Sequence, residues 1–501
     1  MSALLLLIVP FALSGAAAAP SAKNVPDSAA QIRPAHARPY FMPAAERQRI
    51  LGLIQSQPWA KAEHERLKAE AAKGSGFAAG LLYALEGDPK HLDVARKYLL
   101  GALGPDAWEV REYAKRLADP EHFKAGAGDL AGVYYNLDFQ PFVVYDWVCR
   151  GLSAADRKLL EQGIRTRASY RMKAMDRWTQ TPNLVFKPTF MAAMAGLALN
   201  DPEIIQWGFF RTQPHGARLG GYFRVIEVML QDGGPWREAA IYPIAHEDLW
   251  CFSVMSRYGG LLTGRDWWTF QTPNGDSPKG LADYFIDAAY PIEATGYGAG
   301  QIRVATYGDG ATNADGDLFL VNPAGSGLNA EKALIAVYNA SADPRYAAFL
   351  KLVQDYRPDL WDRRPLPPQA VLPPAPSKIW PNYGLAMLRS DESPAYWTNA
   401  RAIAVFHLMS QGYGHDHRDK FSIMLHGAGR LLYPDYNAIQ YENMAIGWTR
   451  NTPCHNTLLV DEQDTDNATP TAIRHEFSPE LKYLATSASG VFEGVEQTRV
   501  L

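Results

Sequence analysis

The spacing of apolar residues along the chain changes from a helical period to a strand period. From Ala44 to about Asn339, apolar positions recur at helical spacing; Ile50, Leu51 and Ile54 form the stripe of a helix that follows Pro43. Gly, Pro and Asp separate such segments, as in Gly87-Asp88-Pro89. The further helices predicted are Ala60–Lys73, Phe77–Leu85, Pro89–Leu103, Ala107–Ala118, Gln140–Cys149, Ala154–Met175 and Thr189–Ala198. Repeated helices without intervening strands predict an all-α layer.

A proline-rich stretch ends this pattern. Residues 356–381 contain eight prolines, which predicts an extended, semi-rigid linker. Short apolar runs bounded by turn residues follow, at Gly384–Leu388 and Ala402–Leu408. Such runs predict the strands of an antiparallel β-sandwich. Because the chain stops at Leu501, directly after an apparent strand start, we expect the sandwich to be truncated.

The polar residues best suited to bind a metal or to take part in catalysis lie around one predicted hairpin. Phe421, Ile423 and Leu425 alternate with polar residues, Gly427-Ala-Gly429 predicts a turn, and Leu431–Tyr433 predicts the returning strand. This hairpin brings Asp435 near His417, and His455 directly precedes a predicted strand at Thr457–Val460. Two imidazoles and a carboxylate suit zinc. The alternative is that His415 and His417 are merely polar residues at an exposed strand start.

Three sequence blocks resemble the heparinase II/III-type polysaccharide lyases, which include several alginate lyases. They are Gly-His-Asp-His-Arg-Asp-Lys-Phe-Ser at 414–422, Leu-Leu-Tyr-Pro-Asp-Tyr at 431–436, and Thr-Pro-Cys-His-Asn-Thr-Leu-Leu-Val-Asp at 452–461. The resemblance implies an α+β multidomain protein with an N-terminal α/α toroid and a C-terminal antiparallel β-sandwich. It implies zinc at His417, Asp435 and His455, and a cleft position for His415.

The expected domains follow from these patterns. They are a signal peptide at 1–19, a toroid at 20–355, a proline-rich linker at 356–382 and a sandwich at 383–501. The apolar run Ala3–Leu13 and the small residues up to Pro20 predict export, so we expect a periplasmic or secreted bacterial protein. No lysine or arginine precedes that run, and it is too short to span a bilayer.

The same resemblance assigns roles in the helical part. Asn183 matches an asparagine that contacts the sugar carboxylate, while Leu184 replaces the histidine that commonly follows it. Tyr242 matches the tyrosine that acts as base. Glu238, Tyr242 and His246 share one face if they lie on one helix, which we expect. The competing interpretations are a turn residue for Asn183 and packing roles for Tyr242 and His246.

A uronate lyase removes the proton α to the sugar carboxylate and expels the 4-linked sugar. The carboxylate must be neutralised, which suits Asn183 and His415, and the base must be activated by nearby positive charge. Arg237, Arg303 and Arg450 are the candidate sources, and the sequence does not choose among them. Tyr441 is a candidate proton donor to the leaving group, with loop packing as the alternative. We expect Asp309, in the turn Gly308-Asp-Gly310, to be structural.

Composition narrows the partners. The net charge of -4 does not suggest a nucleic-acid binder, although a local basic cleft is compatible with it. The acidic polysaccharide expected as substrate is what the family resemblance implies. The three cysteines, Cys149, Cys251 and Cys454, are far apart and predict free thiols. The oligomeric state is left open, with a homodimer among the options.

Two rival classes remain at this point. A toroid-fold glycoside hydrolase needs two carboxylates that flank the scissile bond, and Glu238 and Asp309 are the nominees. A non-catalytic polysaccharide-binding protein is favoured by Leu184. A metalloprotease is disfavoured because the chain has no His-Glu-x-x-His sequence.

Overall fold

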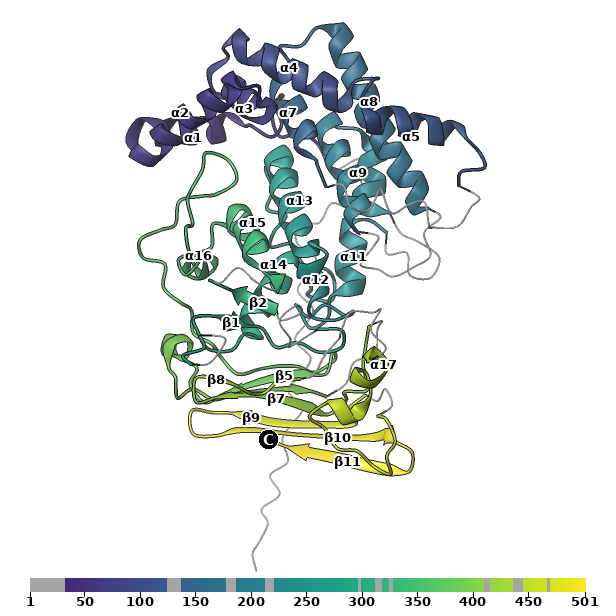
Figure 1. Cartoon of the computed structure of the whole chain (residues 1–501), viewed down its shortest axis with the longest axis vertical. Helices are drawn as coiled ribbons and strands as arrows, with labels where there is room; N and C mark the ends of the chain where they lie inside the picture. Colours follow the sequence, from purple (N-terminus) through teal and green to yellow (C-terminus); the bar gives the residue numbers. More distant parts are fainter. Residues whose placement is uncertain are drawn as a thin grey trace, which may run out of the picture.

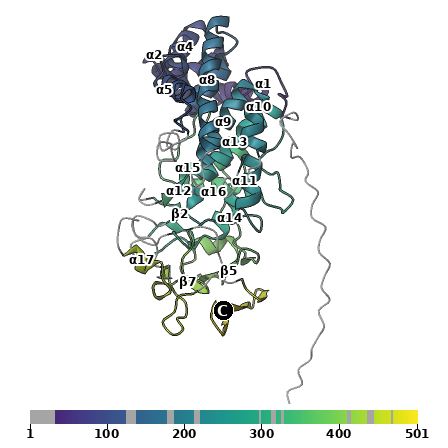
Figure 2. The ribbon, with the colours of Figure 1, turned by 90° about the vertical axis from the view of Figure 1, so that its right-hand side faces the viewer.

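A computed structural model describes residues 32–123, 137–176, 186–211, 220–295, 299–310, 318–323, 328–409, 415–435, 445–465 and 469–501. A helical N-terminal region is followed by C-terminal antiparallel sheets, which lie at the opposite end of the long axis (Figure 1). Figure 2 shows the same stacking from the side, with α8, α9 and α13 above the sheets. Within the described ranges, no helix is long and apolar enough to cross a membrane.

The helices of the first region begin and end largely where proline, glycine and capping residues predict. Predicted and observed bounds agree for α4 and α8, because Asp88 and Ser153 accept hydrogen bonds from the first-turn amides. The helices are α1 (Ala44–Ser56), α2 (Pro58–Ala72), α3 (Gly76–Glu86), α4 (Pro89–Leu103), α5 (Trp108–Ala118), α7 (Gln140–Val148), α8 (Ala154–Met175), α9 (Phe186–Leu199), α10 (Pro202–Ile205), α11 (Tyr222–Met229), α12 (Tyr242–Ala245), α13 (Asp248–Thr263), α14 (Pro278–Asp287), α15 (Glu331–Ser341) and α16 (Pro344–Leu350).

The expectation of an uninterrupted helical region is wrong at one place. A small sheet with the strand order β1-β2-β3 lies between α14 and α15. Its strands are β1 (Ile302–Arg303), β2 (Leu318–Val321) and β3 (Leu328–Asn329). All four residues of β2 are buried. A short, fully buried apolar run has no periodicity that distinguishes a strand from a helix, so the sequence did not predict this sheet.

The C-terminal region contains two antiparallel sheets. The first has the order β4-β5-β6-β7-β8 and the second β11-β10-β9. Their bounds are β4 (Lys378–Trp380), β5 (Leu385–Arg389), β6 (Ala404–Leu408), β7 (Ser422–Gly427), β8 (Arg430–Tyr433), β9 (Ala472–Phe477), β10 (Lys482–Phe492) and β11 (Val495–Val500). The predicted hairpin of β7 and β8 is confirmed.

The two sheets share apolar clusters. One contains Leu388 from the first sheet and Leu484 from the second. His407 also joins them, since its Nδ1 lies 2.9 Å from the carbonyl oxygen of Ser422 and its Nε2 lies 3.0 Å from Thr486 Oγ1.

Two predictions about this region need correction. Residues Thr457–Val460 form no strand; Val460 makes only an isolated bridge, and Leu458 is 55% exposed, so the apolar run has no core to face. The stretch predicted as linker contains β4, which pairs with β5. Trp361 in the same stretch is buried: its ring packs edge-to-face on Trp147, and its Nε1 donates to the Tyr258 hydroxyl at 2.9 Å, so this segment packs along the helices.

The turn at residues 232–236 fastens the helical region to the start of β5. The carboxylate of Asp232 accepts a hydrogen bond from the amide of Tyr383 at 2.8 Å. The hydroxyls of Tyr383 and Tyr307 both donate to the carbonyl oxygen of Trp236, at 2.8 and 3.0 Å. These buried contacts fix the segment that leads to Tyr242 relative to the sheets.

Candidate active site and metal centre

Tyr242 lies at the first position of α12, a single helical turn. Its ring is buried, and its hydroxyl oxygen lies 2.6 Å from His415 Nδ1 and 3.1 Å from an oxygen of Asp309. The prediction that Glu238, Tyr242 and His246 share one helix is wrong. Pro243 would sit inside that helix, where it lacks an amide hydrogen and its ring clashes with the preceding turn.

His415 and Asp309 are fitted to each other through backbone and side chain. His415 Nδ1 lies 2.6 Å from Asp309 Oδ2, and the amide of Asp309 donates to the carbonyl oxygen of His415 at 2.9 Å. Gly308 has a φ of +59°, and a Cβ there would lie 2.5 Å from that carbonyl oxygen, so only glycine fits. His415 itself has a φ of 54°, which is uncommon outside glycine and is typical of functional sites.

Asp309 is the centre of the cluster, although we expected a structural role for it. His417 Nε2 lies 2.8 Å from its Oδ1. Arg450 Nη2 donates to its two oxygens at 2.9 and 3.2 Å. One buried carboxylate thus joins the tyrosine, both histidines and the arginine, which lie 67 to 141 residues away in the sequence.

The charges around His415 favour its protonated form. Burial lowers the pKa of its imidazole, but the neighbouring carboxylates of Asp309 and Glu238 outweigh burial and raise it to about 9. Glu238 is fully buried, and its Oε1 lies 3.3 Å from His415 Nε2. His415 is therefore an imidazolium at neutral pH, placed against the hydroxyl oxygen of Tyr242.

His246 contacts the other side of the tyrosine. The two rings are stacked, with centroids 5.2 Å apart and an interplanar angle of 11°. Burial, together with the charges of Lys187 and His415, lowers the pKa of His246 to about 4. The neutral His246 ring packs against Tyr242 and places no charge beside it.

Of the three candidate arginines, the structure brings Arg450 to the cluster. Arg303 pairs with Glu293, with 2.5 Å between Nε and Oε1. Arg237 donates to the carbonyl oxygen of Val228 at 3.2 Å. Both of these guanidinium groups are engaged elsewhere.

A second group of side chains lies behind the cluster. Donor atoms of Asp419, Asp435 and His455 all lie within 4.8 Å of one another, and all three residues are buried. The His417 ring lies beside this group, with its centroid 5.5 Å from that of His455. Asp419 was not among the predicted metal ligands, although it lies two residues after His417 in the same sequence block.

Buried nitrogen atoms in this group fit a metal ion. His417 Nδ1 and His455 Nε2 have no hydrogen-bond partner among the described residues. His455 Nδ1 pairs with Asp435 Oδ1 at 2.8 Å, and Lys420 Nζ holds Asp419 Oδ1 at 2.8 Å. Two unsatisfied imidazole nitrogens beside carboxylates are the donor set that zinc prefers.

Comparison with known proteins agrees with these blocks. Residues 372–487 match the family model described as heparinase II/III-like, C-terminal. This region is a heparinase II/III-like C-terminal domain. The resemblance found in the sequence blocks is thereby confirmed, since all three blocks fall within the matched residues.

Relatives extend the likeness beyond the heparinase II/III-like domain. The chain is 24% identical to an alginate lyase of Stenotrophomonas maltophilia over 92% of this chain and 64% of that protein. It is 28% identical to an exo-oligoalginate lyase of Saccharophagus degradans over 18% of this chain and 15% of that protein. The chain thus spans less than two thirds of the length of these relatives.

A solved structure shares the fold. The heparan sulfate lyase from Pedobacter heparinus matches with a TM-score of 0.51 and 15% identity, over 84% of this chain and 58% of that one. The likeness thus includes the helical region as well as the heparinase II/III-like domain.

Two predicted site residues, Asn183 and Tyr441, lie outside the described residues, and so does Leu184. The cysteines that we expected to be free are free: Cys149 and Cys251 are buried, and Cys454 is half-buried.

Proposed function

We propose that this protein is a polysaccharide lyase that cleaves a uronate-containing polysaccharide by β-elimination. The observation that carries the proposal is the cluster in which the Tyr242 hydroxyl meets the His415 imidazole and the Asp309 carboxylate. The matched family domain and the likeness to an alginate lyase over 92% of this chain support it.

The proposal includes a finer account of the fold. The helices form an α/α toroid, the proline-rich segment packed along them leads into β4, and the C-terminal sheets from β4 onward form a β-sandwich. The fold likeness to a heparan sulfate lyase supports this arrangement. We also place the protein in the periplasm or outside the cell, on the strength of its apolar N-terminal run.

Tyr242 is the base that removes the proton next to the sugar carboxylate. The hydroxyl of Tyr242 must first give its own proton to solvent, and the imidazolium of His415 at 2.6 Å stabilises the phenolate that results. The C–H electron pair becomes the new C=C bond, the bond to the 4-linked oxygen breaks, and that oxygen takes up a proton. In our proposal Tyr441 donates it.

The sugar carboxylate must be neutralised as charge builds up beside it. His415 and Arg450 present positive charge near Tyr242, and the side chain of Arg450 is 36% exposed, which leaves it accessible to a ligand. Asn183 adds a neutral donor to the same carboxylate. Asp309 holds the two cations in place, so it is a positioning residue.

We propose that zinc is held by His417, Asp435 and His455, with Asp419 as a further donor. The unpartnered nitrogens of the two histidines support this set. A bound ion supplies a fixed positive charge that orders the loops around the cluster. His417 links the two groups, because its other nitrogen contacts Asp309.

The rival hydrolase is disfavoured by the placement of its two carboxylates. Asp309 and Glu238 contact opposite nitrogens of one imidazole, at 2.6 and 3.3 Å. Both are buried by that contact, whereas a glycosidase needs two carboxyl groups facing an open bond.

The test is a panel of uronate polysaccharides incubated with the purified protein. Alginate comes first, because two relatives are named for it. Heparan sulfate, other glycosaminoglycans and glucuronan follow. A lyase gives a product with a conjugated double bond that absorbs ultraviolet light. New reducing ends without that absorbance would identify a hydrolase, and binding without any product would identify a non-catalytic protein.

A further inference from the structure

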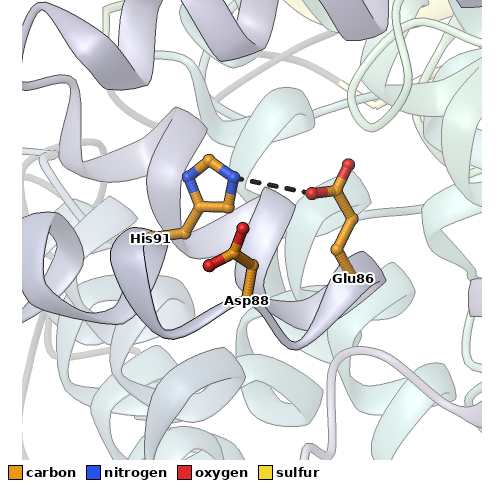
Figure 3. Close-up of side chains that lie close together, drawn as sticks. All are labelled: Glu86, Asp88 and His91. Atoms are coloured by element: carbon orange, nitrogen blue, oxygen red, sulfur yellow. Dashed lines mark ion pairs between the residues drawn. The ribbon is translucent and has the colours of Figure 1, made fainter.

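The junction between α3 and α4 brings together three side chains that the proposed reaction does not use. Glu86 ends α3, Gly87 follows in the left-handed conformation with a φ of 77°, and Asp88 caps α4. Pro89 at the first position of α4 fixes the direction of the new helix. This tight turn places Glu86, Asp88 and His91 on one side of the junction, as Figure 3 shows.

Donor atoms of these three residues lie within 4.8 Å of one another. His91 Nε2 and Glu86 Oε2 are 3.5 Å apart, along the dashed line in Figure 3. Two ligands of a tetrahedral zinc ion at roughly 2.1 Å from the metal are about 3.4 Å apart. The observed separation is therefore compatible with an ion bound between these two atoms.

The imidazole of His91 points to a ligand independently of the carboxylates. His91 is 4% exposed, and its Nε2 has no hydrogen-bond partner among the described residues. A buried polar atom without a partner costs free energy unless something satisfies it. The nitrogen faces the carboxylates, so a cation between them satisfies it.

The surroundings already hold the ligands in place. His64, from α2, lies 2.6 Å from Glu86 Oε1, which leaves Oε2 turned toward His91. Asp88 pairs with the exposed Lys90 at 2.7 Å. An exposed pair of this kind contributes little stability, so a metal can displace it.

We infer that Glu86, Asp88 and His91 form a second site for a zinc-class divalent ion, distinct from the group around His455. One imidazole and two carboxylates select such an ion over Mg²⁺ and Ca²⁺, which take oxygen ligands. The site lies in the helical region, at the end of the molecule away from the C-terminal sheets (Figure 1). Its effect is to fasten α3 to α4.

The test is a zinc titration of the full chain after chelator treatment, in competition with a chromogenic chelator. The variants are Glu86→Gln and His91→Gln, which keep shape but remove a ligand. Asp93→Asn is the matched control, because it makes the same charge change at an exposed position of α4. Circular dichroism checks that each variant is folded.

We expect the unaltered chain and Asp93→Asn to bind the same number of ions and to melt at a higher temperature with zinc. Glu86→Gln and His91→Gln should each bind one ion fewer and lose that part of the thermal shift. The difference between variants does not depend on the metal group at His455. Equal stoichiometry in all four proteins, or no micromolar zinc binding by the unaltered chain, would overturn the inference.

Discussion

The two groups of polar side chains that meet at His417 differ in their access to solvent. His415 and Arg450 have side chains that are 17% and 36% exposed. Asp435 and His455 have side chains that are 2% and 0% exposed. The first group can therefore touch a substrate, whereas the second can only hold the protein, or an ion, in place. Catalysis and stability should respond to different mutations.

The largest expected effect concerns catalysis. His415→Ala removes the cation beside Tyr242, so turnover of the true substrate should fall by about 100- to 1,000-fold, the usual cost of one electrostatic donor. Some loss of melting temperature is expected as well, because the buried carboxylates of Glu238 and Asp309 lose this partner. Initial rates and thermal unfolding check this. A large loss of stability without a loss of rate in the protein that remains folded would contradict the division into a catalytic and a structural group.

The next effect concerns the buried group. Asp435→Ala should lose bound zinc and lower the free energy of unfolding by about 3 kcal/mol or more, since it leaves a buried histidine without its partner. His417→Ala should also lose the metal and lower the melting temperature. Metal analysis and denaturant unfolding are the measurements. Stoichiometric zinc in both variants would contradict the assignment.

A pH titration separates stability from catalysis further. Burial lowers the pKa of His407 to about 4, from about 6.5 in the unfolded chain. The unfolded state therefore binds the extra proton first, and stability should fall as pH drops from about 6.5 to about 4, by up to about 1.4 kcal/mol per pH unit. His407→Gln should flatten this slope in chemical denaturation. An unchanged slope would show that His407 does not contribute to the pH dependence of stability.

The smallest effect is expected at the exposed side of the first group. Arg450→Gln should weaken substrate binding and turnover together, with kcat/KM about tenfold lower, because a partly exposed cation is screened by water. Steady-state kinetics at low and high salt measure it. Arg303→Gln is the matched control and should leave kcat/KM close to normal, since Arg303 pairs with Glu293.

The sequence predicted the local parts of this structure well. Helices α4 and α8 have the expected bounds because proline and serine mark their starts and periodic apolar residues fill them. The β7–β8 hairpin followed from alternation and a glycine turn. The long helix expected through Tyr242 does not form, because Pro243 cannot lie in a helix interior.

The positions of the site residues depend on contacts that no local pattern contains. Asp309 is 106 residues from His415 and 141 from Arg450, so only the packed fold shows that it joins them. The turn at Gly308 was visible, but its purpose, the approach to the His415 carbonyl, was not. Asp419 was not predicted, because its carboxylate comes close to Asp435 and His455 only in the packed fold.

The most direct measurement of the central claim is the turnover of Tyr242→Phe on the uronate polysaccharide that the panel identifies. This change keeps the ring and its stacking on His246 and removes only the hydroxyl. The account predicts a rate at least about 100-fold lower, with substrate binding and melting temperature nearly unchanged. A rate close to that of the unaltered protein would contradict it and would place the base elsewhere, with His246 and His415 the next to test.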